Sequence, residues 1–117
     1  MNSFDESSFA GRVHTPYVSV NSASDLVLGA GNHFMVAGTG FIKAVAVAGW
    51  EPGDVVMLRF QNNPIVKHDT AGGPGTAPIR LAGRVDFNVS NDDVLTLVYT
   101  VSPTTGAGWY EVSRSVN

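Results

Sequence analysis

Short apolar runs separated by Gly, Pro, Asn and Asp make up nearly the whole chain from Tyr17 onward. Runs of this length bounded by turn residues are typical of β-strands. No apolar 3.6-residue period is sustained anywhere, so we expect no helix longer than a turn. The pattern predicts an all-β fold, an antiparallel β-sandwich or jelly roll of about eight strands. The candidate strands are 17–20, 25–28, 33–36, 41–48, 55–60, 65–67, 79–81, 85–89, 94–101 and 109–113.

The candidate strands differ in how their two faces are composed. Apolar and polar residues alternate along 85–89, which indicates a sheet with one solvated face. The strands 41–48, 55–60 and 94–99 carry apolar residues on both faces. In a two-layer sandwich such a strand exposes an apolar face unless the fold or a second chain covers it. We favour a sister subunit and expect the interface between subunits to use Val45, Val47, Met57, Val94 and Val98.

The low content of charged residues also indicates an interface with another chain. Only 15% of the 117 residues are charged, whereas about 25% is ordinary for soluble domains, so part of the surface is expected to face another chain. The formal net charge is −3 and the seven basic residues are spread along the chain, which argues against a nucleic-acid partner. The longest uncharged run, 26–42, is too interrupted by Gly to span a bilayer, so no membrane partner is expected either.

The first sixteen residues differ from the rest of the chain. They are rich in Ser and acidic residues, with isolated aromatic side chains and no sustained period. We expect residues 1–16 to form an extended N-terminal arm and residues 17–117 to form one β-sandwich domain, the alternative for the arm being a disordered tail. The acidic start does not resemble a secretion signal. Phe4, Phe9 and Arg12 are the candidate contacts of the arm with a larger shell.

Catalytic and metal-binding patterns are weak. The residues His14, His33 and His68 lie far apart in sequence and form no close ligand pair. There is no Cys, and the paired glycines lack the third Gly or the Lys-Ser/Thr of phosphate-binding loops. Asp92-Asp93 is read as a turn before a strand, with a calcium site as the alternative. We therefore expect no catalytic residue, no metal and no cofactor.

A ligand-binding tip is the remaining local candidate. Residues 71–78 form a Gly- and Pro-rich loop, read either as a recognition tip or as a flexible connection. Trp50 lies in a turn, and exposed aromatic side chains stack on sugars, although they more often cap a core or an interface. A tip of this kind would use Trp50, His68 and Asp69.

The C-terminal part of the chain has a specific pattern, in which Asn91-Asp-Asp-Val-Leu-Thr-Leu-Val-Tyr99 is followed by the ending Gly108-Trp-Tyr-Glu-Val-Ser-Arg-Ser115. This pattern resembles small β modules of tailed bacteriophages. The resemblance covers roughly residues 26 to 115, and that ending is its most specific part. The other matching segments are Gly40-Phe-Ile-Lys-Ala-Val45, Gly53-Asp-Val-Val-Met-Leu-Arg-Phe60, Ile79-Arg-Leu-Ala-Gly83 and Val85-Asp-Phe87.

This resemblance implies a trimeric β-sandwich with a structural or adhesive role, such as a virion decoration protein or the end of a tail fibre or tailspike. With only a short arm before the module, we expect a capsid decoration (cement) protein, not an enzyme. It would form a homotrimer on the phage head, contact the major capsid protein and be made in the host cytoplasm. The alternative is a receptor-binding module of the tail-fibre type that contacts host surface glycan. A small cupin-like enzyme is disfavoured, because no cluster of His and Glu on neighbouring strands is apparent.

Overall fold

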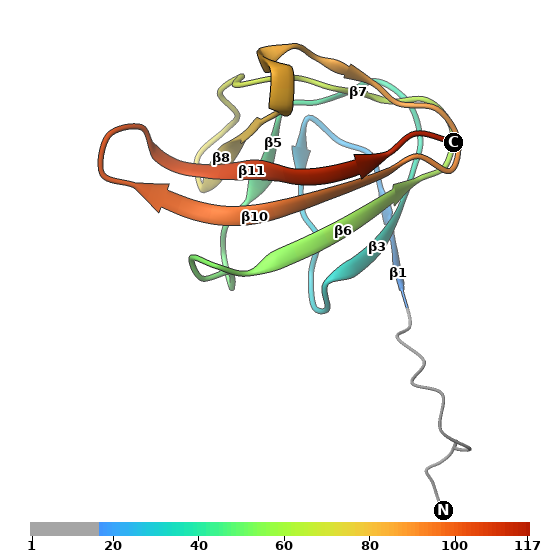
Figure 1. Cartoon of the computed structure of the whole chain (residues 1–117). Coiled ribbons are helices and arrows are strands. Elements are labelled where there is room, and N and C mark those ends of the chain that lie inside the picture. The colour runs from blue at the N-terminus through green and yellow to red at the C-terminus, as the bar shows by residue number, and fades with distance from the viewer. Residues whose placement is uncertain (1–16) are drawn as a thin grey trace, which may run out of the picture.

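Short strands and a single turn of 3-10 helix make up residues 17–117, the part of the chain that the computed structural model describes (Figure 1). The prediction of an all-β fold is confirmed. No helix within these residues is long and apolar enough to cross a membrane. The strands are β1 (Val18–Asn21), β2 (Asp25–Leu26), β3 (His33–Ala37), β4 (Phe41–Ile42), β5 (Ala44–Ala46), β6 (Val55–Phe60), β7 (Ile65–Val66), β8 (Thr76–Arg80), β9 (Phe87–Asn88), β10 (Val94–Ser102) and β11 (Gly106–Ser115), and the helical turn is η1 (Ala82–Arg84).

The strands form two mixed sheets. The larger has eight strands in the order β1-β3-β6-β10-β11-β8-β5-β2, and the smaller has the order β4-β7-β9. The expected antiparallel pairing holds for β6–β10, β10–β11, β5–β8 and β7–β9. The pairs β1–β3, β3–β6, β2–β5, β4–β7 and β8–β11 are parallel instead.

Parallel pairing arises because the chain winds in successive coils. Parallel neighbours need a long crossover connection, and here each crossover connection contains strands that lie on other sides of the molecule. The path β1–β2 is followed by β3–β4–β5 and then by β6–β7–β8, so that Phe34 lies between Val18 and Leu58. The edge strands β1 and β2 are consecutive in the chain, which leaves the larger sheet nearly closed on itself.

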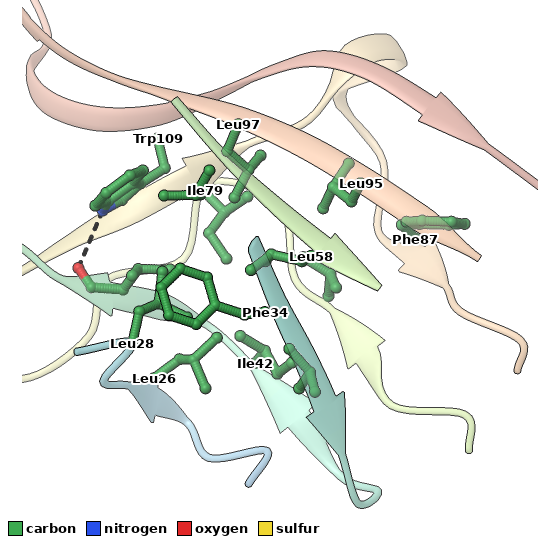
Figure 2. Packing of buried hydrophobic residues seen from close by; sticks show 14 of the residues in the cluster. Leu26, Leu28, Phe34, Ile42, Leu58, Ile79, Phe87, Leu95, Leu97 and Trp109 are labelled. Atoms are coloured by element: carbon green, nitrogen blue, oxygen red, sulfur yellow. Dashed lines mark hydrogen bonds between the residues drawn. The ribbon is translucent and has the colours of Figure 1, made fainter. Parts of the chain in front are cut away.

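The long hairpin of β10 and β11 closes the side of these coils. In Figure 1 it runs across the front of the molecule, where β10 pairs with β6 and β11 pairs with β8. Trp109 on β11 is fully buried, and its indole Nε1 donates a hydrogen bond to the Val45 carbonyl oxygen at 3.2 Å (Figure 2). Tyr99 and Trp50 pack around the Trp109 ring, at centroid distances of 5.0 and 5.6 Å. One core therefore joins the hairpin to the opposite wall.

Strand β5 corrects part of the expected trimer interface. The predicted 41–48 strand is divided at Lys43 into β4 and β5. Val45 is fully buried in the core of its own chain, and Val47 is partly buried and packs against the same core. The prediction that Val45 contacts a sister subunit is wrong, because a side chain with no exposed surface cannot contact a second chain.

The Gly-rich loop explains why β5 is apolar on both faces. A Cβ atom added to Gly72 would lie 2.6 Å from the Cβ of Ala44, so the loop backbone lies directly on the outer side of β5. The Gly73 amide donates to Asp25 Oδ2 at 3.1 Å, and the Val47 amide donates to the Gly75 carbonyl at 3.0 Å. Residues 71–75 therefore pack over the outer side of β5, and β8 begins at residue 76.

The Asp92-Asp93 pair forms the turn that leads into β10. Asp93 is almost fully buried, and its carboxylate accepts hydrogen bonds from the amides of Ser90 at 2.9 Å and Asn117 at 2.8 Å. Asp92 has a left-handed φ of 72° and places its Oδ1 3.3 Å from Arg59 Nη2. Both carboxylates therefore have structural partners, as the turn interpretation predicts.

Candidate functional site

The first candidate surface is the outward side of the sheet where β3, β6 and β10 lie next to each other. Val55 is paired with Val98, Met57 with Thr96, and Met35 of β3 with Arg59. Directly paired residues point to the same side of a sheet, and the intervening residues of these strands are buried in the core. We call this surface the outer face, and its members are His33, Met35, Val55, Met57, Arg59, Val94, Thr96 and Val98.

The outer face is mostly apolar and open to solvent. Val55 and Met57 are 44% and 42% exposed, the Arg59 side chain is 47% exposed, and the remaining members are partly exposed. Arg59 lies on the face itself, since it is paired with both Met35 and Val94, and its guanidinium contacts Asp92 at 3.3 Å. Met57, Val94 and Val98, three of the predicted interface residues, come together on this surface. An apolar sheet face of this kind is suited to packing against another protein surface.

The second candidate is a polar hollow of about 470 Å³ between β8, η1 and the β10–β11 hairpin. Two of its residues, His68 and Asp69, belong to the ligand tip that the sequence predicts. The other lining residues have no signal in the sequence, since β8, η1 and β11 bring them together only in the folded chain. The polar side chains that line this hollow are His68, Asp69, Arg80, Arg84, Thr105, Tyr110 and Glu111.

Arg80 is the best-held cation in the polar hollow. Its guanidinium donates from Nε to Asp69 Oδ1 at 3.1 Å, from Nη1 to the Tyr110 hydroxyl at 3.1 Å and from Nη2 to the Thr105 carbonyl at 3.3 Å. Gly108 makes room for it, because a Cβ there would lie 2.5 Å from Nη1. Burial lowers the pKa of Arg80, but the hydrogen bonds to Tyr110 and Asp69 outweigh it and raise the pKa overall.

Tyr110 shares in the same network. Its hydroxyl lies 3.0 Å from Thr105 Oγ1 and accepts from Arg80. The hydrogen bond with Thr105 lowers the pKa of Tyr110, and the one from Arg80 adds to this against the opposing effect of burial. The Arg80–Tyr110 pair is therefore a fixed donor group at the wall of the hollow, held from both strands of the β8–β11 pair.

His68 is oriented by backbone hydrogen bonds. Its Nδ1 accepts the Leu81 amide at 3.0 Å, and its own amide donates to Asp86 Oδ1 at 2.8 Å. Asp86 also pairs with Lys67 at 2.9 Å. The His68 amide, and then Lys67, lower the pKa of Asp86. Because Nδ1 acts as an acceptor, the neutral ring carries its proton on Nε2.

Glu111 is a structural acceptor at the base of the hollow. Its side chain is only 5% exposed and receives two hydrogen bonds of 2.7 Å from Arg114 and one of 2.9 Å from the Ala82 amide. These bonds, with Arg114 first, lower the pKa of Glu111 despite its burial. Arg114 in turn stacks over the Phe87 ring at 4.0 Å. A carboxylate this well paired anchors η1 to β11 and is a poor proton donor for catalysis.

The predicted ligand tip is divided between two places. Trp50 lines a separate hollow of about 350 Å³ beside residues 27–31 and 46–49, and it shares no lining residue with the polar hollow. Its ring packs edge-on against Phe34 as well as Trp109, so it is largely a core residue. Trp50 therefore does not join His68 and Asp69 in one site.

The remaining candidates are accounted for as follows. Phe4, Phe9 and Arg12 of the predicted arm, and His14, lie outside the described residues. His33 is on β3, with its ring 5.9 Å from that of Tyr17. Between residues 17 and 117 there is no group of three or more His, Asp or Glu side chains that could hold a metal ion.

Comparison of the chain with protein-family models, with curated proteins and with solved structures finds no match.

Proposed function

We propose that this chain is a non-enzymatic structural protein of a phage particle, a capsid decoration protein that binds the assembled head as a homotrimer and stabilises it. The observation that carries the proposal is the outer face, an apolar sheet surface with Val55 and Met57 more than two-fifths exposed. The phage head as its location rests on the resemblance of residues 26–115 to virion β modules. The major capsid protein is the proposed partner in the shell.

The outer face supplies the physical reason for self-association. Specific interfaces bury about 1,600 Å² in total and depend on a well-packed apolar centre. Met57, Val94 and Val98 lie on adjacent strands and are flanked by Val55. Burying these side chains against sister chains removes apolar area from water, and Arg59, the charged residue on the same face, keeps Asp92 as its partner.

The mass of the protein in solution tests this proposal. Light scattering of the full chain is expected to give a mass near three chains. Met57→Lys is expected to give a mass of one chain with an unchanged circular dichroism spectrum, because the lysine would have to lose its hydration at the interface. Val85→Lys is the matched control, since Val85 is 64% exposed and lies outside the outer face. A wild-type protein that is monomeric at all concentrations would contradict the proposal.

Binding to the shell is tested separately. Deletion of residues 1–16 is expected to abolish co-sedimentation with assembled heads while the mass of the oligomer stays near three chains. Heads coated equally well by the truncated protein would refute the arm as the contact to the shell.

A receptor-binding module is the second candidate function, and the polar hollow favours it. A concave site with several converging hydrogen-bonding side chains is the usual form of a small-ligand site. Saturable binding of the full chain to a glycan array would support this function. Binding to heads without any glycan signal would support the decoration protein.

A further inference from the structure

The residues that line the polar hollow carry two positive and two negative charges, Arg80 and Arg84 against Asp69 and Glu111. These charges cancel, but the ion pairs within the chain leave one of the two guanidinium groups without an acidic partner. Arg80 is paired with Asp69, and Glu111 is paired with Arg114 behind the wall. Arg84 also lines the hollow, is exposed, and has no acidic partner within 4.0 Å among residues 17–117. One guanidinium is therefore left uncompensated, in a chain whose formal net charge is −3.

The polar hollow also has more hydrogen-bond donors than acceptors left free by the bonds within the chain. The acceptor oxygens of Glu111 are taken by Arg114 and Ala82. Arg80 carries five N–H groups, of which three are engaged within the chain. His68 adds an Nε2–H, because its Nδ1 is an acceptor. A ligand that fits this surface has to supply acceptor oxygens.

The backbone around Arg84 holds this cation in an unusual conformation. Gly83 and Arg84 have consecutive left-handed φ angles of 79° and 59°, and the Arg84 amide donates to the Leu81 carbonyl at 3.2 Å. A left-handed conformation is rare for a residue with a long side chain and persists only where the surrounding structure determines it. Here the residue in this conformation is Arg84, whose side chain lines the same hollow as Arg80.

We infer that the polar hollow binds a single carboxylate carried by a hydroxyl-rich ligand, with a uronic or sialic acid residue of a glycan as the chemical class. Guanidinium groups match the two oxygens of a carboxylate, and one uncompensated positive charge suits a monoanion better than a phosphate dianion. The Tyr110 and Thr105 hydroxyls provide partners for sugar hydroxyl groups. The volume of about 470 Å³ lies within the range of small-ligand sites. The inference rests on the second candidate function, the receptor-binding module, and does not depend on the oligomeric state.

Binding of simple sugars to the full chain tests the inference. The probes are methyl glucuronide, the methyl glycoside of N-acetylneuraminic acid, methyl glucoside as the neutral counterpart, and acetate as a carboxylate without a sugar. At least one acidic sugar is expected to bind, while the glucoside and acetate bind at least about tenfold more weakly. Arg84→Gln is expected to weaken acidic-sugar binding by about tenfold or more.

Two further variants keep the test decisive. Arg59→Gln is the matched control, since Arg59 pairs with Asp92, lies on the outer face and lines no part of the hollow. Arg84→Lys retains the charge without the two-pronged geometry and is expected to bind with intermediate affinity. Circular dichroism confirms that each variant is folded.

The outcomes separate this inference from the function on which it rests. Equal weakening by Arg84→Gln and Arg59→Gln, or acetate binding as tightly as the acidic sugars, would overturn the inference. Specific binding of neutral glycans alone would overturn it and leave the receptor-binding function standing. Absence of binding to any glycan would overturn both.

Discussion

At the residue scale, Glu111 shows how a carboxylate can be buried without acting as a catalyst. Its side chain is 5% exposed, yet three donors from Arg114 and Ala82 hold it. Breaking a pair by removing one buried charge leaves the other partner without compensation. The hydrogen bond from the Ala82 amide to Glu111 also fastens η1, and thereby the rim of the polar hollow, to β11.

We expect Glu111→Gln to lower the free energy of unfolding by about 1.5–3 kcal/mol at pH 7, the usual loss for a hydrogen bond to a charged group. Because folding lowers the pKa of Glu111 below its ordinary value of 4.5, its stabilisation is full above that pH. The stabilisation disappears as the pH falls through the lower folded-state pKa. Urea unfolding of both proteins at one fixed protein concentration, from pH 7 to pH 3, measures the difference. A difference that does not narrow on acidification would contradict this origin.

At the element scale, short apolar runs bounded by turn residues located most strands correctly. The expected 55–60 strand coincides with β6, and 33–36 and 94–101 each lie one residue short of β3 and β10. The partners of these strands could not be predicted, because a period of two is the same in parallel and antiparallel pairs. An apolar face also looks the same whether a sister chain or a loop covers it. For β5 it is the loop at Gly72, which the composition of 71–78 does not indicate.

The residues of the polar hollow could likewise be predicted only in part from the sequence. His68 and Asp69 were marked because they are adjacent in sequence, whereas Arg80, Arg84 and Tyr110 have no common sequence pattern. The parallel pair Tyr110↔Arg80 and the left-handed turn of η1 bring them together. Only the pairing of β8 with β11 specifies this arrangement.

The loop that covers β5 leads to a prediction about its glycine. A methyl group at Gly72 would lie 2.5 Å from Asp25 Oδ1, 2.6 Å from the Ala44 Cβ and 2.7 Å from Thr76 Oγ1. We expect Gly72→Ala to destabilise the fold by about 1–3 kcal/mol, because the loop would have to move away from β5 and β2. Urea unfolding measures the loss, with the exposed neighbour substitution Ala71→Ser as the control. Equal stability of the two variants would show that the loop is not docked on β5.

At the scale of the whole molecule, coiling leaves the larger sheet with two edge strands, β1 and β2. The strands β6 and β10 each have neighbours on both sides, whereas β1 is paired only with β3 and β2 only with β5. Within residues 17–117 no further strand pairs with the other edge of either. Edge strands with free N–H and C=O groups invite pairing with another chain.

This difference predicts the order in which backbone amides exchange with solvent. The amides of β6 and β10 are expected to exchange slowest, because their release requires opening of the core around Leu58, Leu95 and Leu97, all buried. The amides of the two edge strands, β1 (Val18–Asn21) and β2 (Asp25–Leu26), are expected to exchange fastest in the larger sheet, since only β3 holds β1 and only β5 holds β2. Hydrogen–deuterium exchange followed by mass spectrometry of peptic fragments measures this order. Slow exchange of Val18–Asn21 at high protein concentration that becomes fast on dilution would place a second copy at this edge instead of at the outer face.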